Sequence, residues 1–252
     1  MILKDIIEII EKEYPKNLAS EWDNVGLLAG KETNEIKSVL VTLDITPNVV
    51  DEAVKMNADL ILSHHPLLFG GIKSFREDNE KMNMYVKIIR NNISVYSAHT
   101  NMDTAPNGIN QRLAELFEFS DIEILEDETG LGRVGNIKEI KLKYFCKIVK
   151  EKLNTPNLRV SGNLDNTIKR VAVGSGSCGD YIPLAIKKGA DLMITADMKY
   201  HIAMDSVDNG ISVIDAGHYP TEIIVMDMFE NLLKDTGLKI KKSENKDIFY
   251  YI

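Results

Sequence analysis

The chain has little cysteine and no long apolar run. It contains only two cysteines, Cys146 and Cys178, and they lack a CxxC spacing. This excludes a disulfide framework, and we expect a reducing, cytoplasmic setting in which both thiols are inert. No stretch reaches the roughly 18 consecutive apolar residues of a membrane span, and the first residues interleave charged with apolar side chains, unlike a signal peptide. We therefore expect a soluble intracellular protein without a membrane partner.

Positive charge is also in deficit. The sequence has 30 Lys and Arg residues against 38 Asp and Glu residues, a formal net charge of -8. Nucleic-acid binding needs a concentrated basic face, so nucleic acid is not expected as a partner. The one lysine-rich segment, Lys239, Lys241, Lys242 and Lys246, is interpreted as a solvated edge. A content of 44% hydrophobic and 27% charged residues is typical of a globular protein with a sizeable core.

The first 65 residues predict a helix followed by a parallel strand–helix–strand unit. Apolar residues at Ile6, Ile7, Ile9 and Ile10 indicate an amphipathic helix over 2–13, which should end near Tyr14 because Pro15 follows. Segments 38–44 and 58–63 are short and rich in apolar residues, with a helical stretch over 48–57 between them. Two strands joined by a helix are typical of a parallel sheet.

An internal repeat predicts two similar halves. Residues 37–65 align without a gap on residues 169–197, with eight of 29 positions identical, and residues 92–98 align on 210–216. Convergence on common α/β patterning would explain part of this match, but duplication explains the order of the two blocks. We therefore predict two similar, internally duplicated α/β domains with mostly parallel sheets.

The expected domains are residues 1–125 and 126–252, and the C-terminal residues can pack back on the first domain. Segment 123–135 contains four acids and three glycines and is interpreted as a boundary or linker.

All five histidines follow a predicted strand or lie close behind one. They are His64, His65, His99, His201 and His218. Ligands in parallel α/β sheets bind outside the carboxyl ends of the strands. Adjacent strand residues point to opposite faces, so His64 and His65 can share a site only if the strand ends there, and Pro66 favours that ending. Neutral imidazoles at such an edge are natural ligands for zinc, iron, manganese or nickel, although two surface or capping histidines would give the same pattern.

Two further segments add carboxylates. Asp103 follows His99 after a strand, and in the alternative interpretation it is an ordinary turn or helix-cap residue. His218 and Glu222 are four residues apart, so one helical turn would place both on the same side. Three histidines and two carboxylates exceed the needs of one zinc ion, and suit two divalent ions that share a carboxylate.

The sequence resembles the Nif-three-like family, also known as GTP cyclohydrolase type-two homologues, across essentially its whole length. The matching motifs are EWDNVGLLAG (21–30), LILSHHPLLFGGIKS (60–74), YSAHTNMDTAPNGIN (96–110), ITADMKYHIAMDS (194–206) and IDAGHYPTE (214–222). The resemblance implies a toroidal homohexamer with a two-metal site in the cleft between two α/β domains. Some relatives carry a further domain inserted between the halves, and a chain of 252 residues with so short a repeat offset is expected to lack it.

The resemblance further implies the metal ligands. One ion would be held by His65 and Asp103 and the other by His64 and His218, with Glu222 bridging both.

Three other segments leave alternatives open. The loop Gly174–Gly179 follows a strand and can wrap a phosphate, but its spacing favours an ordinary tight turn. The tripeptide Trp22-Asp23-Asn24 matches the family motif, and a capped turn packed by Trp22 explains it equally well. His201, with Lys199 and Tyr200, is a candidate for a pocket wall or proton transfer, with a structural role as the alternative.

These features predict a cytoplasmic hydrolase with two divalent metal ions per chain and a small-molecule substrate. His99 or His201 would carry protons, because imidazole titrates near neutral pH. The resemblance implies a guanine nucleotide whose ring is opened by water, and a phosphoester or another nucleotide-like metabolite fits the site equally well. The alternative is a non-enzymatic hexameric protein that binds or delivers metal, or an interaction scaffold.

Overall fold

The computed structural model describes residues 1–72, 74–244 and 246–250. The chain divides into two compact units, and each is described by itself. Unit 1 comprises Met1–Met102 and Val225–Lys246, and unit 2 comprises Asp103–Ile224 with the C-terminal residues from Asp247 onwards. Within the described residues, no helix combines the length and the apolar character needed to cross a membrane.

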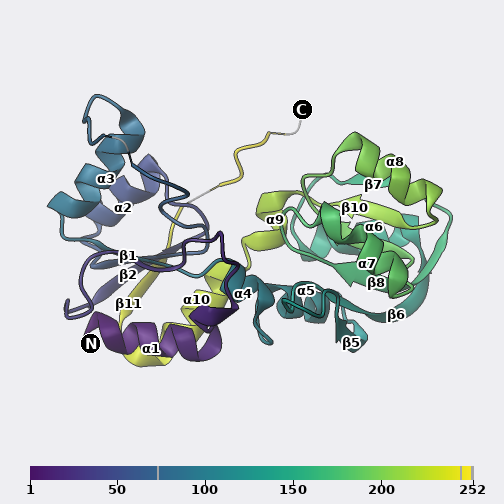
Figure 1. Cartoon of the computed structure of the whole chain (residues 1–252), viewed down its shortest axis with the longest axis horizontal. Helices are drawn as coiled ribbons and strands as arrows, with labels where there is room; N and C mark the ends of the chain where they lie inside the picture. The colour runs from purple at the N-terminus through teal and green to yellow at the C-terminus, as the bar shows by residue number, and fades with distance from the viewer. Residues whose placement is uncertain (73, 245, 251–252) are drawn as a thin grey trace. The chain divides into compact units, whose positions relative to one another are not determined.

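Unit 1 is built on a five-stranded sheet (Figure 1). Its strands are β1 (Gly26–Ala29), β2 (Ser38–Thr42), β3 (Leu60–Ser63), β4 (Ser94–Ser97) and β11 (Lys239–Lys242). The order is β1-β4-β3-β2-β11, with β1 antiparallel to β4 and the remaining neighbours parallel. Every residue of β2, β3 and β4 is buried. Parallel strands covered on both faces have this character.

Helices cover both faces of this sheet. They are α1 (Leu3–Glu13), α2 (Pro47–Lys55), α3 (Glu80–Arg90) and α10 (Val225–Leu233), with short 3-10 turns at Lys16–Leu18 and Lys234–Thr236. Figure 1 shows α2 and α3 on one side of the strands and α1 and α10 on the other. The short helix α4 (Thr100–Thr104) contains the division between the units.

The predicted elements of unit 1 are confirmed. Helix α1 ends at Glu13, before the Tyr14-Pro15 step, and buries Leu3, Ile6 and Ile10, while Ile7 and Ile9 are only half-buried. Thr46 caps α2 by accepting a hydrogen bond from the Val49 amide at 3.3 Å, which supplies one of the partners that a helix start lacks.

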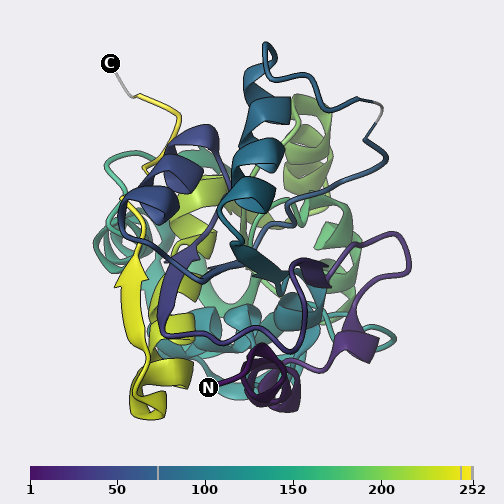
Figure 2. The ribbon, with the colours of Figure 1, turned by 90° about the vertical axis from the view of Figure 1, so that its left-hand side faces the viewer.

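The C-terminal strand β11 forms one edge of the unit 1 sheet. Figure 2 shows it as the yellow arrow beside α10. Lys241 forms an ion pair with Glu52 at 2.7 Å, and Lys242 forms one with Glu230 at 2.9 Å. The lysine-rich segment is therefore a charged edge, as expected, and charges on an edge strand discourage pairing with another chain.

Unit 2 is built on a six-stranded mixed sheet. Its strands are β5 (Ser120–Ile124), β6 (Arg133–Lys141), β7 (Arg159–Ser161), β8 (Thr167–Val173), β9 (Leu192–Thr195) and β10 (Ser212–Asp215), in the order β5-β6-β8-β9-β10-β7. Strands β8, β9 and β10 are parallel, and the outer strands are antiparallel to them or to each other. The helices are α5 (Ile109–Leu116), α6 (Leu142–Lys152), α7 (Ile182–Lys187), α8 (Tyr200–Asp208) and α9 (His218–Glu222), with a 3-10 turn at Gly179–Tyr181.

The structure repeats the elements that the sequence alignment pairs. Strand β3 and strand β9 match position for position at an offset of 132 residues, and β4 and β10 match at an offset of 118. The short helices α4 and α9 that follow also correspond at 118. The fold is therefore the predicted α/β class, with two sheets and mostly parallel strand pairs.

The segment expected to be a boundary or linker belongs to unit 2. Residues 123–135 contain the turn of a hairpin between β5 and β6, with Gly130 and Gly132 at positive φ of 88° and 69°. Glycine tolerates these values because it has no Cβ. An acidic, glycine-rich segment therefore has the same composition whether it joins two domains or two strands. The division between the units falls at Met102/Asp103, not near residue 125.

Candidate metal centre

The histidines of unit 1 lie at the carboxyl ends of adjacent parallel strands. His64 and His65 directly follow β3, and His99 follows β4 two residues after its end. The amides of His64 and His65 donate to the carbonyls of Thr42 and Leu43 at 3.2 and 3.0 Å. The chain therefore leaves the sheet without losing its backbone partners, and this lets two consecutive histidines serve one site.

Three imidazole rings meet at this edge. The ring centroid of His64 lies 5.1 Å from the centroid of His65 and 5.1 Å from that of His99. The centroids of His65 and His99 are 5.4 Å apart. One nitrogen from each ring can be chosen so that all three lie within 4.8 Å of one another. His64 is fully buried, while His65 and His99 are partly open to solvent. Three converging nitrogen donors with an open side form the kind of arrangement that holds a transition metal.

Each of these rings is anchored through its Nδ1 atom. The partner is the carbonyl oxygen of Ala98 for His64 (2.9 Å), the carboxylate of Asp44 for His65 (2.7 Å) and that of Asp23 for His99 (3.0 Å to each oxygen). A carbonyl oxygen only accepts, so the His64 Nδ1 carries a proton, and in the neutral ring Nε2 carries the lone pair. Metal-binding histidines characteristically donate their other N–H to a carboxylate or carbonyl in this way.

Asp23 is the strongest of these anchors. Its side chain is buried and also accepts hydrogen bonds from the Thr100 amide (3.0 Å) and hydroxyl (2.6 Å). Burial alone would raise the pKa of Asp23, but the hydrogen bonds from His99 and Thr100 outweigh it and hold the pKa well below its usual range. Trp22 is 69% exposed, so the alternative of a turn packed by Trp22 is disfavoured.

In unit 2, His218 and Glu222 lie together on α9, as their spacing predicts. The His218 Nε2 atom is 2.9 Å from Glu222 Oε2, and its Nδ1 atom is 2.7 Å from Asp197 Oδ2. The hydrogen bond with Glu222 raises the pKa of His218 to about 9, against the opposing effect of burial, and Asp197 adds to the increase. Glu222 itself is buried. The imidazole is thus anchored at Nδ1 here as well, with Nε2 beside a carboxylate.

The loop Gly174–Gly179 is an ordinary βα turn whose amides serve the fold. The Ser175 amide donates to Asn110 Oδ1 (2.8 Å), the Gly176 amide to Thr221 Oγ1 (3.1 Å) and the Cys178 amide to Thr195 Oγ1 (3.0 Å). A phosphate cradle needs such amides to point at the ligand. The phosphate alternative is therefore disfavoured.

Gly176 in this loop leaves room for the His218–Glu222 pair. A Cβ atom built on Gly176 would lie 2.2 Å from Glu222 Oε1 and 3.2 Å from His218 Cε1, and its φ is 54°. Any larger residue would displace the carboxylate. The sequence signal for this role is weak, since glycine-rich turns follow strands in many α/β proteins.

Asp103 and His201 have different surroundings. Asp103 is buried in α4, and its backbone carbonyl accepts a hydrogen bond from Asn110 at 3.0 Å. His201 lies exposed at the start of α8, where its ring contacts Tyr200 at 5.4 Å. Among the hydrogen bonds of the described residues, none anchors the His201 ring.

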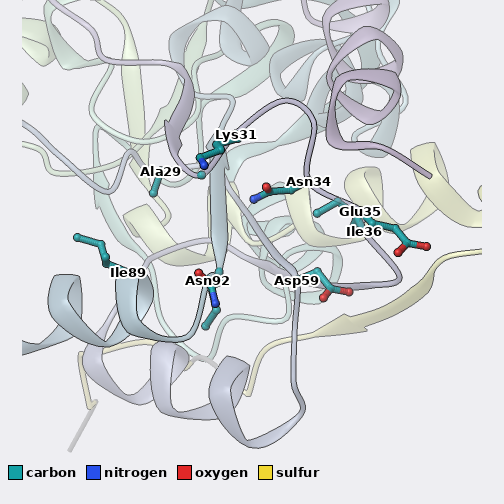
Figure 3. A pocket seen from close by; sticks show the side chains of 10 residues that line it. Ala29, Lys31, Asn34, Glu35, Ile36, Asp59, Ile89 and Asn92 are labelled. Atoms are coloured by element: carbon teal, nitrogen blue, oxygen red, sulfur yellow. The ribbon is translucent and has the colours of Figure 1, made fainter.

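A cavity of about 510 Å³ in unit 1 contains none of the predicted site residues. It is lined by Ala29, Gly30, Lys31, Asn34, Glu35, Ile36, Asp59, Ile89, Asn92 and Ile93 (Figure 3). Asp59 precedes β3, and Asn92 and Ile93 precede β4, so the cavity adjoins the amino ends of these strands. Ligands of parallel sheets bind at the carboxyl ends, so the histidine-rich edge is the better candidate.

The donor set fits a divalent transition metal. Imidazole nitrogens with carboxylate oxygens suit zinc, iron, manganese and nickel, and they do not select among these ions. The anchored Nδ1 atoms and the space left by Gly176 favour ligation over a merely structural hydrogen-bond network.

Comparisons with known proteins place the chain in one family. The family model Duf34/NIF3 (NGG1p interacting factor 3) matches residues 1–248. A Clostridium perfringens protein named GTP cyclohydrolase 1 type 2 homolog is 38% identical over 263 residues, covering all of both chains. That name belongs to the Clostridium perfringens protein.

Solved structures agree with this match. A Bacillus cereus protein related to NIF3 has a TM-score of 0.92 and 25% identity, covering 100% of this chain and 99% of its own. Reduced HcgD from Methanocaldococcus jannaschii has a TM-score of 0.87 and 34% identity, covering 97% and 98%. Because the family model spans nearly the whole chain and a full-length relative is 38% identical, this protein belongs to the Duf34/NIF3 family.

Proposed function

We propose that this chain is a hydrolase that depends on two divalent metal ions held by His64, His65, Asp103, His218 and Glu222. The observation that carries the proposal is the shared anchoring of His64, His65 and His218. Each Nδ1 atom lies 2.7–2.9 Å from a carbonyl or carboxylate oxygen, so each ring is oriented to use Nε2. Metal-binding histidines characteristically share this arrangement, whereas surface histidines do not require it.

The roles of the ligands follow from their chemistry. Glu222 has two carboxylate oxygens and is the residue that we assign to bridge the two ions. His65 and Asp103 would hold one ion, and His64 and His218 the other. Divalent ions bound to such ligands polarise substrate oxygens and make water acidic enough to attack near neutral pH. Glu222 is buried and its Oε2 atom lies 2.9 Å from His218 Nε2, so its carboxylate is close to the ring nitrogen that we assign to the same ion.

His99 is the residue to which we assign proton transfer. Its Nδ1 atom is held by both oxygens of Asp23, so Nε2 can accept a proton while the carboxylate stabilises the resulting imidazolium. His201 lacks such an anchor among the described residues, so its predicted part in proton transfer has less support from geometry.

The substrate proposal rests on the names of the relatives. A cyclohydrolase activity would consume GTP by hydrolytic opening of the imidazole ring of guanine, and a phosphoester is the second substrate class. Metal-stripped protein reloaded with zinc, manganese, iron or nickel should be incubated with GTP and with simple phosphoesters. Loss of the guanine absorbance supports the cyclohydrolase, and phosphate release supports a phosphoesterase. No turnover of either at full metal occupancy would contradict the hydrolase and favour a protein that binds or delivers metal.

We further propose a homohexamer, which the family resemblance implies. Six chains of 28.3 kDa give a particle of about 170 kDa. Light scattering in mild salt should show this mass, and a monomer alone would contradict the ring.

A further inference from the structure

Two large aromatic side chains are exposed beside His99. Trp22 is 69% and Phe69 is 64% exposed. Their ring centroids lie 6.0 and 5.7 Å from that of His99, and both rings stand nearly perpendicular to it, at 77° and 86°. Burying an aromatic ring is favourable, so two such rings exposed to water beside the same imidazole call for an explanation.

The loops that carry these rings are tied in place. Asn24 donates from Nδ2 to the carbonyl of Leu68 at 2.8 Å, which joins the loop of Trp22 to the loop of Phe69. Asp23, between Trp22 and Asn24, is bound to His99 and Thr100. The backbone positions from which Trp22 and Phe69 extend are therefore fixed relative to each other and to His99.

The perpendicular contacts leave ring faces accessible. A ring that meets its neighbour at nearly 90° uses an edge or a single face, so at least one face of each ring is not covered by His99. Flat heteroaromatic rings stack on such faces, and the exposed sides of His65 and His99 offer polar partners at the edge of the ligand. A flexible aliphatic chain would gain less from two rigid flat surfaces.

We infer that Trp22 and Phe69 form a stacking subsite for a planar nitrogen heterocycle, which they hold against His99. The inference deepens the proposed function by assigning the part of the substrate that contacts the protein beside the metal ligands. It assigns binding to the ring system, and assigns no contact to a phosphate or a sugar. Trp22 and Phe69 are accordingly specificity residues, since they contact the bound ring and leave its reacting atoms to other groups.

The test measures binding of guanosine, adenosine and ribose 5-phosphate to the full-length protein as purified. The variants are Trp22→Leu and Phe69→Leu, which keep apolar bulk but remove the ring. The matched control is Phe75→Leu, because Phe75 is similarly exposed, at 58%, in the same stretch of unit 1. The chain has a single tryptophan, so quenching of its fluorescence in the wild type reports stacking on Trp22 directly.

We expect both nucleosides to quench this fluorescence and ribose 5-phosphate to leave it unchanged. Equilibrium dialysis should show about 5- to 100-fold weaker nucleoside binding in Trp22→Leu and Phe69→Leu, with Phe75→Leu equal to the wild type. Equal nucleoside binding by all four proteins would overturn the inference. So would ribose 5-phosphate binding as tightly as guanosine, or variants that change only the mass of the assembly, which would make the pair a contact between copies.

Failure of this inference is distinguishable from failure of the proposed function. If the variants keep their metal content and phosphoester turnover and bind nucleosides like the wild type, only the stacking subsite is wrong. If nucleoside binding depends on Trp22 and Phe69 while no metal condition gives turnover, the subsite is supported and the hydrolase is wrong.

Discussion

The two units use the same residues at the amino ends of their central strands. Asp59 of unit 1 accepts hydrogen bonds from the amides of residues 37 and 38 at 2.8 and 2.9 Å, and Asp191 of unit 2 accepts them from residues 169 and 170 at 2.8 Å. Gly30 and Gly162 each approach a strand serine so closely that a Cβ would lie 2.5 Å from its hydroxyl oxygen. Both pairs are separated by the repeat offset of 132 residues.

At the carboxyl ends the corresponding residues differ. His65 of unit 1 corresponds to Asp197 of unit 2, and Asp44 corresponds to Gly176, at the same offset. In unit 1 the carboxylate anchors a histidine of the strand end, whereas in unit 2 Asp197 anchors His218 on the following helix. The comparison shows that residues that hold the scaffold are the same in both halves, while the donor sets at the carboxyl ends of the strands differ.

The largest expected effect comes from removing the negative charge of Glu222 in unit 2. Glu222→Gln keeps the shape of the side chain but removes the charge that we propose to bridge the two ions. Both metal occupancies should fall together, and turnover should fall by more than the about 10- to 100-fold that outer partners of metal ligands cost. Metal content and turnover measured beside the exposed Glu115→Gln control check this. Two tightly bound ions in Glu222→Gln would contradict the bridging role.

The next effect tests the space that Gly176 leaves. Gly176→Ala should push Glu222 aside and weaken metal binding by up to about 100-fold. Gly189→Ala is the matched control, because Gly189 also has a positive φ, 74°, but nothing lies within 4 Å of its added Cβ. It should cost about 1–2 kcal/mol of stability through backbone strain and leave metal affinity unchanged. Equal metal affinity in both variants, measured by titration calorimetry, would refute the role of Gly176.

A smaller effect compares the two carboxylate anchors. Asp44→Asn and Asp197→Asn each remove a charge behind one histidine while keeping the side-chain shape. Each should weaken metal binding about 10-fold, since an amide orients the ring less firmly than a carboxylate. Metal titrations with both variants show whether the two units support their histidines alike. Unchanged affinity in either variant would show that its anchor is dispensable.

The smallest effect is a pH dependence confined to unit 2. The pKa of His218 is raised to about 9 in the folded, metal-free protein, against about 6.5 for an unfolded chain. Its contribution to stability is therefore fully present below about pH 6.5 and is lost as the pH rises through 9. With EDTA present, the difference in melting temperature between the wild type and His218→Gln should shrink over this range. A constant difference would contradict the paired, protonated state of His218.

Much of the fold could be predicted because strand and helix patterns are local. The repeat located β3, β9, β4 and β10, and Pro15 marked the end of α1. The division of the chain could not be predicted, because a β-hairpin turn and a linker have similar compositions. The sequence left open whether the C-terminal residues pack back on the first domain. Strand β11 pairs with β2, some 200 residues away, and no local pattern encodes that pairing.

The site shows the same limit. Histidine spacing after predicted strands indicated His64, His65, His99 and His218, whereas their anchors were missed. Asp23 is 76 residues from His99, and an isolated aspartate in a turn looks like a helix or turn cap. The position of His201 after a strand gave it the same apparent rank as the others, although its ring lies exposed on a helix.

Metal stoichiometry in histidine variants tests the central claim most directly. Wild type, His65→Ala and His201→Ala should be loaded with the same ion, dialysed and analysed for metal per chain. We predict two ions in the wild type, loss of mainly one in His65→Ala and two in His201→Ala, because of these two residues only His65 has an anchored ring and is proposed as a ligand. Full occupancy in His65→Ala together with metal loss in His201→Ala would contradict the assignment of the metal centre.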